Sequence, residues 1–414
     1  MIQYTLRSTF KNNTLYYINI ILILIVFASS AYAGPREQAK RIHDRIAGVP
    51  PSAADLDAME AILDNGNPAD DLDAVDIALE NSSFYNVTLK NFVTPWTNEE
   101  QTVFASLNDY TATVIGMIRD DIPFNQVLSG NILYIGQSGL GLPSYSMADN
   151  NHYVAMEEQN IDLKTGLEQI TQSSITNLPA EATSGIITTR AAAKAFFSDG
   201  TNRAMFRFTL MNHLCTDLEQ IKDTSRATDR IRQDVSRSPG GDSRIFLNAC
   251  VGCHAGMDPL TQAYAYYDYE YDAENDPDAE NGQLSYNTAS DTDPFTNSRV
   301  KRKYRINANN FEHGYITTND DWVNYWRFGP NANLGWSTSL TGSGSGAKAM
   351  GEELANSHAF AQCQVKKVFQ NVCLREATST TDNNEIERIT EVFKTNNYSM
   401  KRVFAETALY CKGD

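Results

Sequence analysis

The pentapeptide Cys250-Val251-Gly252-Cys253-His254 constrains this chain more than any other feature of its sequence. Two cysteines three residues apart, followed at once by a histidine, form the C-x-x-C-H pattern that is typical of c-type haem attachment. Thiols one helical turn apart can add to the two vinyl groups of one porphyrin, and the next residue then falls under the iron. The pattern therefore predicts one covalently attached haem c, bound through Cys250 and Cys253, with His254 as the proximal iron ligand.

Two other interpretations of this pattern are half of a zinc site and a thiol redox pair. A structural zinc site normally takes a second close pair of ligands. The remaining cysteines are spread widely along the chain, at Cys215, Cys363, Cys373 and Cys411. No second close pair is present, and this favours the haem interpretation.

The first 33 residues differ in character from the rest of the chain. Arg7 and Lys11 precede a mostly apolar run from Ile18 to Phe27, and Ala31-Tyr32-Ala33 has the A-x-A form of a cleavage site. This arrangement predicts a secretory signal peptide over residues 1–33. The apolar run is short for a bilayer span, so we expect no membrane span after cleavage, with an uncleaved anchor as the alternative. Export to the bacterial periplasm or cell surface also suits haem attachment, because c-type maturation takes place outside the cytoplasm.

The chain is strongly acidic. Of its 34 Lys and Arg residues, two fall within residues 1–33, which contain no Asp or Glu, so 32 basic and 51 acidic residues remain, with a formal charge of −19. Nucleic acid and anionic membrane surfaces are therefore excluded as favoured partners. The charge favours a redox partner protein with a basic docking face. Assembly into an oligomer or polymer stays open.

The four cysteines outside the pentapeptide predict two disulfides in an exported protein. Residues 360–373 carry apolar side chains at helical spacing, and ten residues of helix would separate Cys363 from Cys373 by about 15 Å. That separation is too long for a disulfide. Each of these two cysteines is therefore predicted to pair with Cys215 or Cys411, and which pairs with which stays open. Free buried thiols are the alternative.

Helical patterns recur along the chain, and few alternating runs are long enough for a central sheet. Ser52 and Asp382 are predicted helix caps. These patterns predict a mainly α, multi-helical protein. Its expected parts are an N-terminal helical domain (34–180), a central cytochrome-c-like haem module with long loops (181–350) and a C-terminal helical cap (351–414).

The second iron ligand has two candidates. Met350 follows a flexible Gly/Ser loop C-terminal to the attachment pattern, where distal methionines commonly lie, and His313 is the other candidate. Met257 is only three residues beyond His254, on the same side of the porphyrin, so we expect it to pack there. For His152 a surface role is favoured over ligation.

Arginines are concentrated just before the attachment pattern. Two roles are equally compatible with them: hydrogen bonding to haem propionates, and salt bridges to the many carboxylates of the chain. The residues concerned are Arg226, Arg230, Arg232, Arg237 and Arg244.

Four segments resemble a bacterial family of exported cytochrome c proteins best known from planctomycetes, which have flanking domains of unassigned function. Residues 45–52 (RIAGVPPS) resemble its GxPP opening, and residues 118–124 (IRDDIPF) are similar to its EDRPF stretch. Residues 250–260 closely resemble its C-x-x-C-H-x-x-[I/M]-D-P haem pattern, and residues 360–365 resemble its terminal helical module. The resemblance implies haem attachment at the same pentapeptide. It implies no distal ligand and no reaction.

Three functions follow as expectations. The first is an exported monohaem c-type cytochrome that transfers single electrons. The second is a haem enzyme of the peroxidase or oxidase type, whose distal position would be open. The third is a structural or surface protein with a redox-sensing haem. Coordination separates the first two, because six-coordinate low-spin haem favours transfer and five-coordinate haem favours chemistry.

Overall fold

The computed structural model describes residues 33–235, 243–309 and 311–413. The predicted signal peptide, except its last residue, and Arg237 lie outside these residues. The chain is mostly helical, which confirms the mainly α prediction. Within the described ranges the longer strands form three separate antiparallel pairs, and none of them makes a central sheet.

The helices and strands follow one another along the chain with short 3-10 and π segments between them. The α-helices are α2 (Pro35–Ala47), α3 (Ala53–Leu63), α4 (Asp71–Leu79), α5 (Lys90–Val93), α6 (Asp109–Arg119), α7 (Asn151–Glu158), α8 (Leu163–Gly166), α9 (Gln172–Ile175), α10 (Arg190–Phe197), α11 (Arg203–Leu214), α12 (Ser243–Ala249), α13 (Val251–Thr261), α14 (Gly346–Ala355), α15 (His358–Cys373), α16 (Thr380–Thr395) and α17 (Met400–Tyr410). The strand pairs are β1 (Ile132–Gly136) with β2 (Leu167–Thr171), β3 (Tyr267–Glu270) with β4 (Gln283–Tyr286), and β5 (Asp321–Val323) with β6 (Ser343–Ser345).

Local capping chemistry explains where two of these helices begin. The Ser52 side chain accepts a hydrogen bond from the Asp55 backbone and starts α3, as predicted. For α16 the prediction was wrong, because Ser379 is the cap. Asp382 is the third helical residue instead, and it completes a capping box with Ser379. The cap therefore lies three residues earlier than the sequence pattern indicated.

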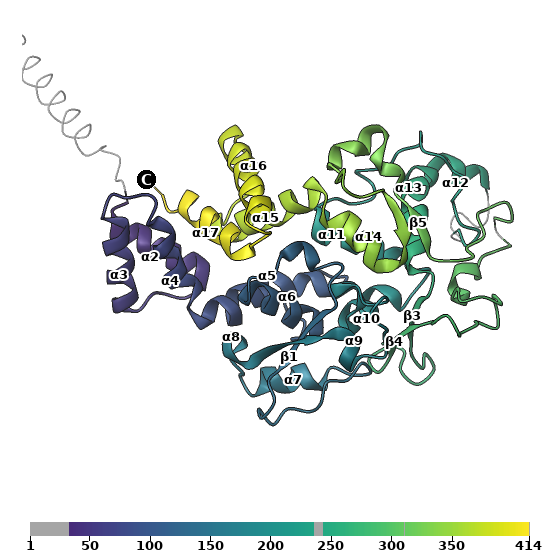
Figure 1. Ribbon diagram of the computed structural model, residues 1–414, viewed down its shortest axis with the longest axis horizontal. Helices are drawn as coiled ribbons and strands as arrows, with labels where there is room; N and C mark the ends of the chain where they lie inside the picture. The colour runs from purple at the N-terminus through teal and green to yellow at the C-terminus, as the bar shows by residue number, and fades with distance from the viewer. Residues whose placement is uncertain (1–32, 236–242, 310, 414) are drawn as a thin grey trace, which may run out of the picture.

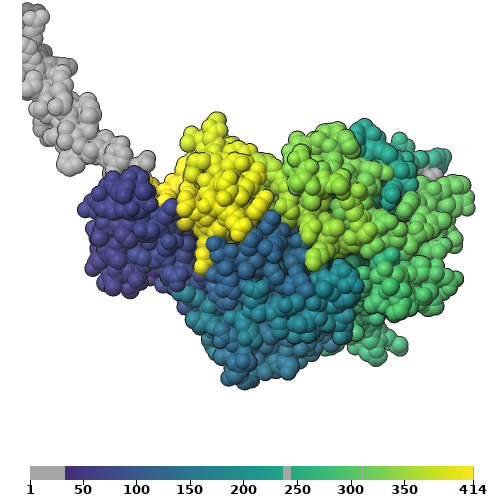
Figure 2. All heavy atoms as spheres, in the orientation of Figure 1, coloured from purple at the N-terminus to yellow at the C-terminus, as the bar shows by residue number. Residues whose placement is uncertain are grey.

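The main hydrophobic core runs through the whole described chain. It contains buried side chains from Ala39 near the start to Ala408 near the end, and from all three predicted domains. The C-terminal helices α15, α16 and α17 (yellow) lie beside the N-terminal helices and above α5 and α6 (Figures 1 and 2). Helix α17 contacts both α2 and α4. The two ends of the chain are thus packed together, while the three-domain division stays a prediction.

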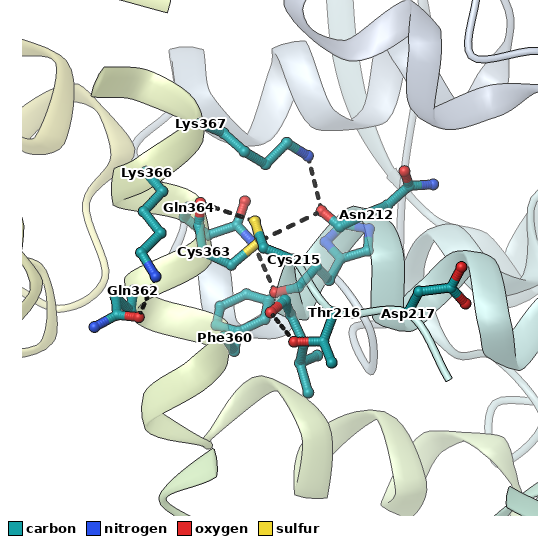
Figure 3. The surroundings of a disulfide bond; sticks show 12 residues. Asn212, Cys215, Thr216, Asp217, Phe360, Gln362, Cys363, Gln364, Lys366 and Lys367 are labelled. Atoms are coloured by element: carbon teal, nitrogen blue, oxygen red, sulfur yellow. Dashed lines mark hydrogen bonds between the residues drawn. A yellow bond between two sulfur atoms is a disulfide. The ribbon is translucent and has the colours of Figure 1, made fainter. Parts of the chain in front are cut away.

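The four cysteines outside the pentapeptide form two disulfides, as predicted. Cys215 pairs with Cys363 and Cys373 with Cys411, with Cα–Cα distances of 5.2 and 5.5 Å. The first bond joins the end of α11 to α15 (Figure 3). The second joins the ends of α15 and α17. The pairing that the sequence left open is settled by which helix ends meet.

Within the described residues, every helix is too short or too polar to cross a bilayer.

Candidate haem-attachment site

The pentapeptide lies at the junction of α12 and α13, at the end of the molecule opposite the N-terminal helices (Figure 1). Cys250 caps α13, and its carbonyl oxygen accepts from the backbone nitrogens of Cys253 and His254, both at 3.2 Å. These bonds close one helical turn around the three residues. The structure therefore brings all three predicted attachment residues together on a single turn.

Both cysteines of the pentapeptide are free thiols and half-buried. The Cys253 thiol donates a weak hydrogen bond to the Leu218 carbonyl oxygen, with a sulfur–oxygen distance of 3.6 Å. Burial, together with nearby Glu219, raises the pKa of Cys253. Within the described part of the chain, no group of three or more His, Cys, Asp and Glu side chains is placed to hold a metal ion.

His254 has one ring nitrogen tied to a carboxylate. Its Nδ1 lies 3.1 Å from Asp258 Oδ1, one helical turn further along α13. An ionised carboxylate can only accept, so Nδ1 is the donor, and in the neutral imidazole the lone pair is then on Nε2. Metal-binding histidines are held in this way by a carboxylate or carbonyl on the other nitrogen. The side chain of His254 is 14% exposed.

Asp258 is fully buried and belongs to a charged network beneath His254. Burial alone would raise its pKa, but the Arg203 guanidinium, with His254, holds the pKa of Asp258 well below its ordinary value. Arg203 binds both carboxylate oxygens, at 2.8 Å through Nε and 2.9 Å through Nη2. The same guanidinium reaches Asp234 at 2.9 Å, and Asp234 is also fully buried. One cation is therefore shared by two buried carboxylates.

Most of the arginines before the pentapeptide have partners within the protein. Arg226 pairs with Asp223 at 2.9 Å. Arg232 is completely buried, with its guanidinium 4.3 Å from the centre of the Tyr304 ring. The salt-bridge interpretation therefore applies to Arg226 and also to Arg232, whose Nε lies 3.3 Å from Asp234 Oδ1 in the network beneath His254.

A second, smaller hydrophobic cluster lies beside the pentapeptide, apart from the main core. It contains Ile231, Val235, Phe246 and Val251, with Cys250 and Phe311 packed against it. The Phe246 ring lies 5.1 Å from the His254 ring, centre to centre. Helix α12 also exposes Ile245 and Leu247, each by 49%. The surroundings of Cys250 and of the His254 ring are thus largely apolar, as a porphyrin face requires, whereas Cys253 faces the Leu218 carbonyl oxygen and nearby Glu219.

Close packing fixes the position of α13. Gly256 lies against the fully buried Trp326, and a Cβ atom at Gly256 would fall 2.0 Å from Trp326 Nε1. Only glycine allows the helix to approach the indole this closely.

The candidate distal ligands lie in very different environments. Met350 is fully buried within the main core on α14. His313 is 88% exposed and lies 3.5 Å from Glu312. Met257 is buried in the main core, as expected of a packing residue. The surface role favoured for His152 is wrong, because it is buried and its ring nitrogens bond the Gly136 nitrogen and the Pro143 carbonyl oxygen.

Three features of this site were not predicted from the sequence: Arg203, Asp234 and the hydrogen bond from His254 to Asp258. Asp258 was open to inference, because it lies four residues after His254 and therefore on the same helix face. Arg203 and Asp234 come from distant segments and carry no local signal.

The donors fit a c-type haem: two free thiols and an anchored imidazole on one turn, with apolar side chains beside Cys250 and His254. Known proteins add nothing to this assignment, since no family model, curated protein or solved structure matches the chain.

Proposed function

We propose that this protein is an exported monohaem c-type cytochrome that transfers single electrons. One observation carries the proposal: two free thiols and a histidine share one helical turn, and the histidine Nδ1 is already bound to a buried carboxylate. Residues 181–350 then form the cytochrome-c-like module. The resemblance of residues 250–260 to the haem pattern of the planctomycete-type family supports the same conclusion.

Each residue of the candidate site has a distinct role in this proposal. Cys250 and Cys253 would hold the haem through thioether bonds, and His254 Nε2 would ligate the iron. The haem, when bound, supplies the one-electron chemistry. Asp258 keeps the proton on Nδ1, and the apolar cluster around Phe246 keeps water from one side of the site.

The electrostatics suit a protein partner. A formal charge of −19 after removal of residues 1–33 favours a redox partner with a basic docking face and speeds encounter with it at low ionic strength.

A haem enzyme with an open distal position is the second candidate, and one observation favours it. The Met350 side chain is held in the main core, and the His313 ring is in solvent beside Glu312. Either residue would have to leave its present surroundings to reach an iron bound at His254 Nε2.

An absorption spectrum tests the proposal. The protein is exported with a c-type maturation system, purified, and measured oxidised and after reduction with dithionite. Wild type is expected to show sharp reduced α and β bands. These bands should vanish in a Cys250→Ala, Cys253→Ala variant and persist in the matched Cys373→Ala, Cys411→Ala control.

Each possible spectrum distinguishes between the candidate functions. Wild type without haem under these conditions contradicts the cytochrome assignment. A high-spin haem that readily binds added ligands favours the enzyme. A weak far-red methionine-to-iron band favours electron transfer with a methionine as the sixth ligand.

A further inference from the structure

We infer that Asp258 is the positioning residue for His254, fixing the imidazole for the iron and lowering the reduction potential of the haem. This inference rests on the proposed function.

The geometry leaves the Asp258 carboxylate little freedom to rotate. Oδ1 accepts from His254 Nδ1 at 3.1 Å and from Arg203 Nε at 2.8 Å. Oδ2 accepts from Arg203 Nη2 at 2.9 Å and from the backbone nitrogen of Arg232 at 3.1 Å. Because three separate residues hold this buried carboxylate, the direction of its bond to His254 is set by the fold and not by α13 alone.

The bond has an electronic consequence as well as an orienting one. A carboxylate that accepts from Nδ1 makes the imidazole more basic at Nε2. A more basic ligand stabilises the oxidised iron over the reduced iron, which lowers the potential. Arg203 moderates the effect, since it shares the Asp258 charge through two hydrogen bonds.

Asp234 provides a matched control within the same network. It is as deeply buried as Asp258 and binds the same Arg203 guanidinium, at 2.9 Å. Within the described residues its charged partners are Arg203 and Arg232, and His254 is bound to Asp258 instead. An Asp-to-Asn change at either position removes one buried charge beside Arg203, but only the change at Asp258 alters the bond to the histidine.

The experiment compares the holoproteins of wild type, Asp258→Asn, Asp258→Glu and Asp234→Asn. Midpoint potentials are measured by spectroelectrochemistry, and the oxidised haem is examined by electron paramagnetic resonance. Asp258→Asn should favour the reduced form about tenfold, which is a rise of about 59 mV for a one-electron couple. Its g-values should shift too. Asp258→Glu should recover most of the wild-type potential, and Asp234→Asn should move it by less than a third as much.

The outcomes distinguish a failure of the proposed function from a failure of the proposed role of Asp258. Wild type without covalent haem means that the proposed function fails. Wild type with haem, and equal potentials in the two Asp-to-Asn variants, overturns the role of Asp258 alone. If Asp258→Asn yields no holoprotein, Arg203→Lys decides. In Arg203→Lys the Asp258 charge is compensated less well, so the reduction potential of the haem should fall. An unchanged potential in this variant counts against the inference.

Discussion

The C-terminal helices and the segment around α13 are stabilised in different ways. Helices α15 to α17 bury apolar stripes, including Phe360, Val368 and Phe404, and a disulfide joins the ends of α15 and α17. Helix α13 also buries apolar residues, among them Met257 and Leu260, but it adds the buried Asp258 next to Arg203 and Asp234. Burying ions costs desolvation free energy that their pairing only partly returns. The C-terminal helices are thus stabilised mainly by apolar burial, whereas the α13 segment contains a buried ion network that adds less to stability.

The largest expected effect comes from removing a buried aromatic ring from the C-terminal helices. Phe404→Ala removes a fully buried ring that lies 5.1 Å from Phe84 and 5.6 Å from Phe92, centre to centre. It should lower the free energy of unfolding by about 3–5 kcal/mol. Denaturant unfolding measures this, with Phe104→Ala as control because that ring is 92% exposed. The control should change stability by less than about 0.5 kcal/mol. A shifted haem potential in Phe404→Ala would contradict the separation of the two regions.

The next effect concerns the packing of α13. Gly256→Ala places a Cβ atom 2.0 Å from Trp326 Nε1 and should destabilise the protein by about 1–3 kcal/mol through overpacking. Gly252→Ala on the same helix is the control, because its nearest neighbours, side-chain atoms of Lys222 and Thr224, are 3.3 Å away. The control should be clearly less destabilising, since its neighbours need to shift by only a few tenths of an ångström and alanine is the better helix former. Thermal unfolding of Gly252→Ala and Gly256→Ala measures the difference in stability. Equal unfolding midpoints in the two variants would mean that α13 is not packed closely against Trp326.

The smallest expected effect concerns a charged residue of the C-terminal helices, Asp382 in α16. Asp382 accepts from Arg375 and Tyr410 and completes the α16 capping box, so Asp382→Asn should cost about 1 kcal/mol at neutral pH. The Arg375 hydrogen bond holds the pKa of Asp382 well below its ordinary value. A lowered folded-state pKa stabilises the protein fully above the unfolded-state value of about 3.9, and this stabilisation is lost as the pH falls below it.

Denaturant titrations from pH 7 to pH 3 check the sign of this effect. The stability difference between wild type and Asp382→Asn should shrink on acidification. Asp57→Asn serves as control, because its carboxylate is 67% exposed and pairs with Arg36 at the surface. A difference that grows at low pH would contradict the assigned pairing.

Part of this architecture was predictable because its signals are local. The helical stripe over residues 360–373 predicted most of α15 (His358–Cys373). The spacing within residues 250–254 put two thiols and an imidazole on one turn. A helix between Cys363 and Cys373 excluded their pairing. Each conclusion needs only the period of an α-helix and the covalent reach of a side chain.

Other features depended on segments that meet only in the folded chain. The sequence could not choose between the two remaining disulfide pairings, because that choice follows from α11 ending against α15. His152 was assigned to the surface because its loop is polar, yet the fold buries it and engages both of its ring nitrogens.

By itself, then, the sequence determined the helical character, the attachment turn and the number of disulfides, since nearby residues decide all three. Only the tertiary structure decided what lies beneath His254. Arg203 and Asp234 are 55 and 24 residues before Asp258 in the chain, and their charges affect the imidazole only because folding removes water from between them. Electrostatic interactions strengthen where solvent is excluded, and which groups share such a place is a property of the fold.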